Sequence, residues 1–174
     1  MTFDSAKAAL ASTRFVDLRW VQETGSTNAD MVGLLAEVTV SPDRPVVLVT
    51  DFQSAGRGRL DRTWAAPAGS SVLMTIGLPI AHVPADRWTL LTSALALAVA
   101  GAPSVEGVLK VKWPNDLVAV GVGDDGGDRK VGGVLAELRD IPGRGSCALL
   151  GIGLNANWPD LPADLQSTAT SLQR

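Results

Sequence analysis

The stretch Lys110-Val-Lys-Trp-Pro-Asn-Asp116 is the most informative in this chain. Apolar and polar residues alternate from Val108 onward, which predicts a strand with Lys110 and Lys112 on one face. Pro114 has no N–H to donate to a sheet ladder, so the strand should end there. The two lysines and the polar residues after them could face an anionic ligand. They could equally be the charges of a solvated edge strand, which discourage aggregation.

A row of three polar residues precedes a predicted helix. Gly25-Ser-Thr-Asn28 leads into residues 29–38, whose apolar side chains recur at helical spacing. Ser26 or Thr27 is a suitable N-cap residue. Because capping requires only one such side chain, the other two could bind a small polar ligand at the helix start, although all three could simply belong to the cap.

Three arginines alternate with glycines after a strand-like apolar segment, residues 46–50. The segment reads Gln53-Ser-Ala-Gly-Arg-Gly-Arg-Leu-Asp-Arg-Thr-Trp64. Glycines let this backbone bend freely, and guanidinium groups donate paired hydrogen bonds to phosphate or carboxylate oxygens. The spacing matches neither a Walker loop nor a dinucleotide fingerprint. The segment could therefore fold over an anion, or it could be a basic surface loop or a nucleic-acid contact.

Two apolar segments, residues 130–138 and 147–155, are expected to pair. A cluster of glycine and aspartate at residues 121–128 lies between the apolar residues 117–120 and the first of these segments, which predicts an antiparallel hairpin with a long tip. Gly132 and Gly133 would weaken a strand unless another backbone or a ligand must approach closely.

Together these motifs resemble the biotin–protein ligases, also called biotin–acetyl-CoA-carboxylase ligases. The matching segments, in the family's order over about residues 20 to 172, are Gly25–Asn28, Gln53–Arg59 with Trp64, Lys112–Asp116, Lys130–Glu137 and Gly151–Asn155. The resemblance implies an α+β fold with a mixed, largely antiparallel sheet and flanking helices. Such a fold is similar to class II aminoacyl-tRNA synthetase cores and to the biotin–lipoate ligase catalytic core, and one domain would span residues 1–174.

The resemblance also implies a reaction in two steps. Biotin would react with ATP, in the presence of Mg²⁺, to give biotinyl-5′-AMP and pyrophosphate. A lysine of the biotin carboxyl carrier domain of a carboxylase would then take the biotinyl group and release AMP. Two anions must meet in the first step, so the site needs positive charge.

The family's functional residues can be carried over to matching positions. Lys112, Arg57 and Arg59 would be catalytic, with Lys112 near the biotin carboxylate and the α-phosphate, and with the arginines closing over the intermediate. The residues expected to contact biotin are Ser26, Thr27, Asn28, Gln53, Arg57, Gly58, Arg59, Lys112, Gly132 and Gly133. The residues expected to contact the nucleotide are Arg59, Trp64, Lys112, Asn115 and Asn155. No metal ligand is assigned.

Two features depart from the family's pattern. Asp61 stands where members commonly carry glycine, and the sequence ends at Arg174, where members continue with helices and a small β-barrel. No helix-turn-helix precedes residue 20, so we expect neither repressor function nor nucleic-acid binding. Two alternative functions stay open: a lipoate–protein ligase-like acyl adenylate transferase, and a non-catalytic fragment that binds biotin or adenylate.

Bulk properties are those of one globular domain. The chain has 174 residues, 46% of them hydrophobic, and a net charge of −3 that argues against a general polyanion binder. Cys147 is the one cysteine and lies in an apolar pattern, which predicts a reduced core thiol and a cytoplasmic setting. Residues 88–100 are apolar but shorter than the ~20 residues of a membrane span, so we predict a buried core helix and no membrane partner.

Overall fold

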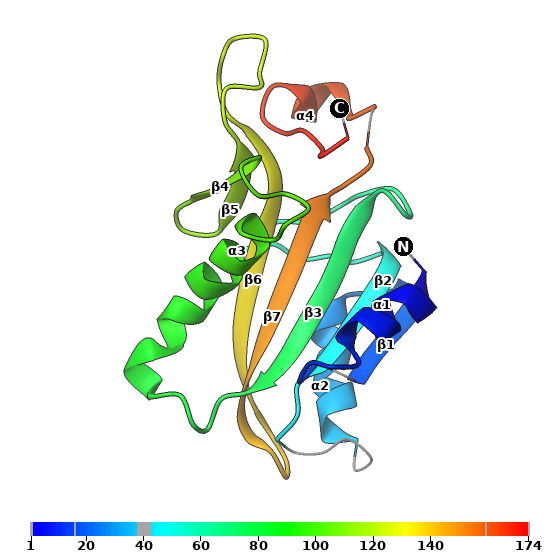
Figure 1. Cartoon of the computed structure of the whole chain (residues 1–174), viewed down its shortest axis with the longest axis vertical. Helices are drawn as coiled ribbons and strands as arrows, with labels where there is room; N and C mark the ends of the chain where they lie inside the picture. Colours follow the sequence, from blue (N-terminus) through cyan, green and yellow to red (C-terminus); the bar gives the residue numbers. More distant parts are fainter. Residues whose placement is uncertain (1, 16, 38–42, 159, 174) are drawn as a thin grey trace.

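One twisted sheet organises the residues that the computed structural model describes, which are 2–15, 17–37, 43–158 and 160–173 (Figure 1). Within them the strands are β1 (Asp17–Thr24), β2 (Val46–Gln53), β3 (Ser71–Pro79), β4 (Leu109–Lys112), β5 (Asp116–Ala119), β6 (Arg129–Ile141) and β7 (Gly145–Asn155). The helices are α1 (Phe3–Leu10), α2 (Thr27–Ala36), α3 (Leu91–Ala100) and α4 (Ala163–Gln166), and a 3₁₀ helix, η1 (Ala85–Leu90), precedes α3.

The sheet is mixed and largely antiparallel, as the resemblance implied. Its strand order is β1-β2-β3-β7-β6-β5-β4, and of these neighbours only β1 and β2 run parallel. The predicted hairpins are also confirmed, because β5 pairs with β6 and β6 with β7 in antiparallel register. The strand that carries Lys110 and Lys112 ends before Pro114, as expected, and it forms one edge of the sheet.

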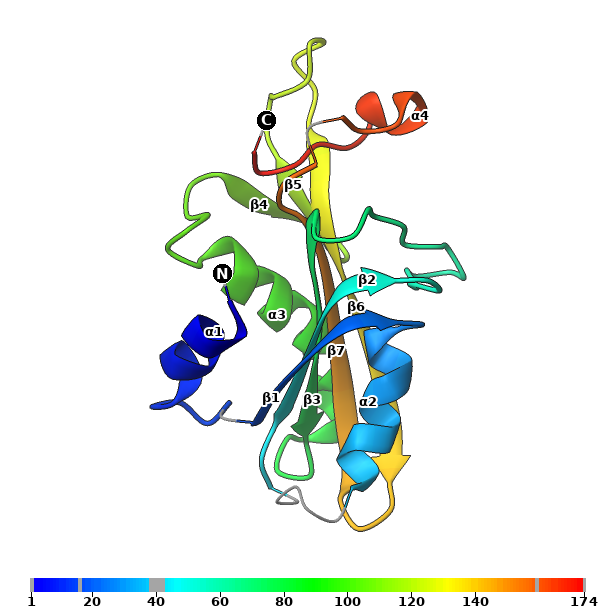
Figure 2. The same ribbon diagram turned by 90° about the vertical axis from the view of Figure 1, so that its right-hand side faces the viewer.

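Side-chain alternation along β7 divides the core between two faces of the sheet. Leu149 packs with Met31 and Leu35 of α2 on one face, whereas Ile152 and Leu154 pack with α3 on the other. Figure 2 shows α2 and α3 on opposite sides of the sheet. The predicted helix after Asn28 is therefore confirmed through Ala36, while Val38 lies outside the described residues.

The prediction of a buried core helix over residues 88–100 is wrong. The segment is divided between η1 and α3, and within α3 only Ala96 is buried while Leu97 is 62% exposed. One face of α3 packs on the sheet, and the face toward solvent also carries alanine and leucine. Because both faces are apolar, the sequence shows no amphipathic pattern here. No helix among the described residues is both long and apolar enough to cross a membrane.

Cys147 is fully buried beneath α2, which confirms that it is a core thiol. Burial raises the pKa of the Cys147 thiol above its ordinary value. The group therefore stays protonated and unreactive at neutral pH.

The packing of α2 on β3 can be tested at a glycine. A Cβ on Gly77 would lie 2.7 Å from Met31 Sδ and 3.0 Å from Leu35 Cδ1. We expect Gly77→Ala to lower the free energy of unfolding by about 1–3 kcal/mol, because the packed core must shift. Equilibrium urea unfolding measures the change.

Gly33→Ala is the matched control, because a Cβ there would meet no atom within 4 Å on the exposed side of α2. This change should raise the free energy of unfolding by about 0.4–1 kcal/mol through the better helix propensity of alanine. Equal stability of Gly77→Ala and the unmodified chain would contradict the packing described here.

Candidate active site

A cavity of about 320 Å³ opens where α2 begins, between the arginine segment (residues 53–64) and the strands β5 and β6. Its volume lies at the lower end of the range for small-molecule sites. The described residues that line it are Ser26, Thr27, Asn28, Gln53, Arg57, Gly58, Arg59, Leu60, Arg62, Thr63, Trp64, Pro114, Asn115, Asp116, Lys130, Gly133, Val134, Leu135, Gly151, Ile152 and Gly153.

Two glycines of the central strand β7 make room for this cavity. Leu149 fills the space under α2, but Gly151 and Gly153, two and four residues further along the same face, have no side chains. A Cβ on Gly151 would collide with the Asn28 amide, and one on Gly153 would lie 2.5 Å from the Trp64 ring. The cavity therefore requires glycine at both positions.

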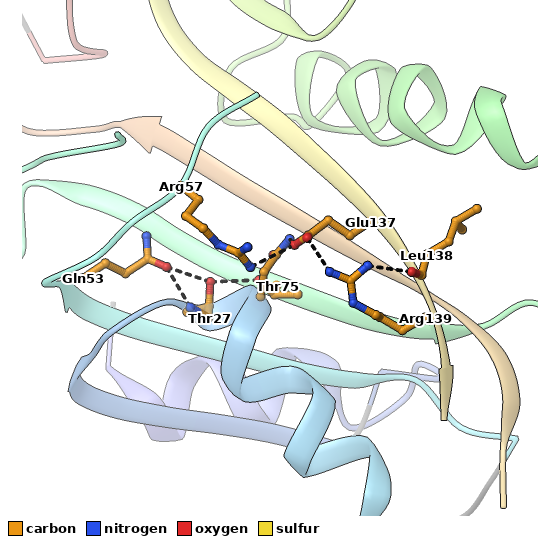
Figure 3. A network of polar contacts seen from close by, with 8 residues as sticks. Thr27, Gln53, Arg57, Thr75, Glu137, Leu138 and Arg139 are labelled. Atoms are coloured by element: carbon orange, nitrogen blue, oxygen red, sulfur yellow. Dashed lines mark hydrogen bonds and ion pairs between the residues drawn. The ribbon is translucent and has the colours of Figure 1, made fainter. Parts of the chain in front are cut away.

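The polar residues at the start of α2 do more than cap it. Ser26 occupies the N-cap position but makes no side-chain capping hydrogen bond. Thr27 donates from its backbone N–H at 2.8 Å and from its hydroxyl at 3.0 Å to Gln53 Oε1 (Figure 3). Because a backbone N–H can only donate, Gln53 must present its oxygen here. Its amide nitrogen has no hydrogen-bond partner among the described residues and is left to serve a ligand.

Asn28 connects α2 to two strands of the sheet. Its Nδ2 donates to Glu137 Oε2 at 2.8 Å, and its Oδ1 lies 2.6 Å from the Thr75 hydroxyl, which can donate to it. The Thr75 oxygen is also 2.8 Å from Thr27 Oγ1. Thr27, Asn28 and Thr75 are almost fully buried, so this floor of the cavity is fixed before any ligand binds.

The arginine segment crosses the mouth of the cavity and is held on two sides. Arg57 Nη2 lies 3.2 Å from Glu137 Oε2, and Arg59 Nη1 lies 3.2 Å from Asn115 Oδ1. Asn115 in turn donates to the Val134 carbonyl at 2.9 Å. The segment is thus tied to β6 through Glu137 and to the turn between β4 and β5 through Asn115.

The tip of the arginine segment has a backbone shape that favours glycine. Leu60 and Asp61 have φ angles of +57° and +55°. Residues other than glycine adopt this left-handed region only at a cost, which aspartate tolerates better than most. The position where the sequence departs from the family's glycine is therefore one where glycine would fit without strain.

Lys130 is a lysine that lines the cavity, and the sequence analysis did not assign it a role. Its Nζ lies 2.6 Å from Asp116 Oδ1 and 5.7 Å from the centre of the Trp64 ring. A β-bulge between β5 and β6 at Leu117 sets the local register near it. The sequence could have pointed to Lys130 only through its position two residues before Gly132, an expected ligand contact. The β-bulge beside it leaves no periodic pattern in the sequence.

Lys112, the expected catalytic lysine, is not among the described residues that line the cavity. It is the last residue of the edge strand β4, and it and Lys110 are both exposed. Their placement is that of a solvated edge strand, which was one of the two interpretations of this stretch.

Gly132 and Asn155, two other expected ligand contacts, have structural positions outside the cavity lining. A Cβ on Gly132 would lie 2.7 Å from the Gly153 carbonyl oxygen, so a neighbouring backbone makes the close approach. The nearly buried Asn155 donates to the Thr170 carbonyl at 3.1 Å and accepts from the Ser71 hydroxyl at 3.4 Å. Asn155 thus fastens the C-terminal segment.

The C-terminal segment, residues 168–170, holds the backbone of Lys130 in place. The Lys130 backbone N–H donates to the Thr168 carbonyl at 2.8 Å, and the Thr170 N–H donates to the Lys130 carbonyl at 2.8 Å. The C-terminal segment therefore fixes the backbone from which the Lys130 ammonium reaches the cavity. No group of three or more potential metal-binding side chains occurs within the described residues.

Sequence comparisons show that known biotin ligases are similar to this chain. A biotin–[acetyl-CoA-carboxylase] ligase of Mycobacterium tuberculosis is 37% identical over 161 residues, which are 87% of this chain and 53% of that protein. The bifunctional ligase/repressor BirA of Bacillus subtilis is 34% identical over 132 residues, which are 74% of this chain and 38% of that protein. The chain thus spans about half the length, or less, of these two relatives.

Solved structures share the fold. A biotin protein ligase from Aquifex aeolicus in complex with biotin and ATP superposes with a TM-score of 0.67 at 29% identity, over 91% of this chain and 60% of that one. The ligase from Leishmania major in complex with biotinyl-5-AMP gives 0.66 at 24% identity, over 89% and 62%, and shows likeness of fold alone. Residues 26–155, most of the chain, match the biotin/lipoate A/B protein ligase family model. On these grounds the chain belongs to the biotin/lipoate A/B protein ligase family.

Proposed function

We propose that this chain activates biotin with MgATP to biotinyl-5′-AMP and transfers the biotinyl group to a lysine of a biotin carboxyl carrier domain. One observation carries the proposal: a single cavity combines a fixed polar floor with four cationic side chains from its described lining, Arg57, Arg59, Arg62 and Lys130. The identity of the substrates is suggested by two relatives, the biotin–[acetyl-CoA-carboxylase] ligase of Mycobacterium tuberculosis and the Aquifex aeolicus ligase in complex with biotin and ATP.

The polar floor suits the ring end of biotin. A ureido group has N–H donors beside a carbonyl acceptor, so it needs acceptors and a donor close together. Thr27 supplies a hydroxyl oxygen, and the free amide nitrogen of Gln53 supplies a donor. The backbone at Gly133, where the nearest atom to an added Cβ would be Lys130 Nζ at 3.4 Å, then leaves room for the aliphatic tail to run toward Lys130.

The cations suit the first chemical step. A biotin carboxylate oxygen attacks the α-phosphorus of ATP, and the bond to the pyrophosphate oxygen breaks. Lys130 would lie beside both anions and stabilise the negative charge that develops on the phosphorus oxygens. In the free chain Asp116 is its counter-ion at 2.6 Å, so a ligand oxyanion would replace that carboxylate. We therefore assign to Lys130 the role first expected of Lys112.

Mg²⁺ would enter with the nucleotide. It usually binds proteins through one or two carboxylates and keeps waters and phosphate oxygens as its other ligands. Asp116 is the carboxylate among the described lining residues, and release from Lys130 would free it to contact the metal directly or through water. Trp64 would pack against the adenine, since its ring lines the same cavity.

The arginine segment would protect the product of the first step. A mixed anhydride hydrolyses readily, so water must be kept out until the acceptor lysine arrives. Arg57 and Arg59 lie across the mouth and already have partners on its opposite sides. We also propose a cytoplasmic location, in keeping with the single buried thiol, Cys147.

A non-catalytic biotin or adenylate binder is the alternative, because the chain spans about half of its curated relative in Mycobacterium tuberculosis. Calorimetry with biotin, followed by biotin with MgATP and a pyrophosphate assay, distinguishes the two functions. A ligase should bind biotin more tightly once MgATP is present and release pyrophosphate. Biotin binding that MgATP leaves unchanged would favour the binder. An absence of biotin binding, with or without MgATP, would contradict both the ligase and a binder of biotin.

The assignment of the catalytic lysine leads to a second prediction. Lys130→Met should lower the rate of pyrophosphate release by about 10²–10³-fold, the usual loss when a transition-state donor is removed. Lys112→Met is the matched control and should leave the rate nearly unchanged, because its ammonium group lies outside the cavity. The opposite ranking of the two variants would return the role to Lys112.

The third prediction concerns retention of the intermediate. Arg59→Gly should let biotinyl-5′-AMP escape, because the tie to Asn115 at 3.2 Å is lost. Blotting for biotin on unrelated proteins added to the reaction detects the escape as labelling of their lysines. Asp61→Asn, in the same segment, exposed and outside the cavity lining, should not label them. Equal labelling by both variants would indicate general loosening of the loop instead.

A further inference from the structure

We propose that Glu137 is a positioning residue that couples the polar floor of the cavity to the arginine segment at its mouth. The inference rests on the proposed function, whose substrates it uses as probes. Glu137 is not among the described residues that line the cavity, so it would act through Asn28 and Arg57, which do line it. In Figure 3 its carboxylate lies between the side chains of Arg57 and Arg139.

The two oxygens of the Glu137 carboxylate have separate partners. Oε2 accepts from Asn28 Nδ2 at 2.8 Å and lies 3.2 Å from Arg57 Nη2, so both cavity contacts share one atom. Oε1 accepts from Arg139 Nη2 at 2.8 Å on the exposed side of β6. Oε2 thus binds two residues that line the cavity, and Oε1 binds an exposed arginine.

The charge of Glu137 fixes the direction of the Asn28 amide. An ionised carboxylate can only accept hydrogen bonds, so Asn28 must turn its nitrogen toward Glu137. Its oxygen then faces the Thr75 hydroxyl at 2.6 Å, inside a nearly closed core. A glutamine at position 137 has one acceptor oxygen and one donor nitrogen, so it can accept from Asn28 and Arg57 only by turning its nitrogen toward Arg139, which is another donor. It also lacks the negative charge that attracts Arg57.

Glu137 also holds the Arg57 side chain in position through an ion pair. The Arg57 side chain is 47% exposed, and the segment around it contains Gly56 and Gly58. Its only ion pair within the described residues is the one with Glu137. A half-exposed ion pair contributes little to overall stability. Loss of the pair should therefore change the position of Arg57, and with it the closure of the cavity, much more than the stability of the fold.

The test compares Glu137→Gln with Arg139→Met in the full chain. Arg139→Met removes the ion pair on Oε1 and leaves Oε2 with both cavity partners, so it is the matched control. Calorimetry should show about tenfold weaker biotin binding in Glu137→Gln, the loss expected when a hydrogen bond to a charged acceptor becomes one to a neutral acceptor. Escape of biotinyl-5′-AMP, measured by labelling of unrelated proteins, should rise in the same variant. Neither quantity should change in Arg139→Met.

Two further variants separate positioning from a loss of fold. Thr75→Val removes the hydroxyl at the other end of the Asn28 amide, and it should weaken biotin binding without increasing the escape of adenylate. Arg57→Met should increase the escape, and addition of Glu137→Gln to it should increase the escape no further. Thermal unfolding of each variant verifies that the fold persists.

One measurement does not depend on a ligand. In the free chain, NMR relaxation of the arginine Nε–H groups should show that the Arg57 side chain becomes more mobile in Glu137→Gln. In Arg139→Met the mobility of Arg57 should not change. Unchanged mobility, biotin binding and adenylate escape in Glu137→Gln would overturn the inference, as would equal effects of both variants. If the unmodified chain fails to bind biotin, the proposed function fails, whereas the NMR result still decides the role of Glu137.

Discussion

The site depends on two side chains that the central strand lacks. Where β7 passes beneath α2 its inward residues are large and packed, but at Gly151 and Gly153 the surface of the sheet is bare. Asn28 enters the first gap and Trp64 the second, each closer than a Cβ would permit. The helix start and the arginine segment can therefore meet over the sheet, and the cavity is the space that they leave.

Charge is arranged in the cavity before a ligand arrives. The chain as a whole carries a net charge of −3, yet cationic side chains gather in this cavity. Two of them have a carboxylate partner, because Lys130 is paired with Asp116 and Arg57 with Glu137. Such pairs hold the cations in place and lower the cost of gathering them in one cleft. A ligand with oxyanions at one end and hydrogen-bonding groups at the other matches both parts of this arrangement.

Several strands and part of the outline of the site were predictable because they follow from local patterns. Alternation located β4, apolar segments located β6 and β7, and Pro114 marked the end of a strand. Residues 26–28 and the arginine segment do meet in the cavity. It was not predictable that Lys130, and not Lys112, lines the cavity, since this depends on which strand is at the edge and on a bulge. Thr75 gave no signal, because an ordinary strand residue became part of the site only through pairing beside Gly151.

The most direct test is a crystal structure of the chain with biotin bound. The ureido group should lie within hydrogen-bond distance of Thr27 and of the Gln53 amide nitrogen. The carboxylate should lie beside the Lys130 ammonium, with Asp116 no longer in contact with that lysine. Biotin bound elsewhere, or with its carboxylate held by Lys112 at the edge of the sheet, would contradict the proposed site.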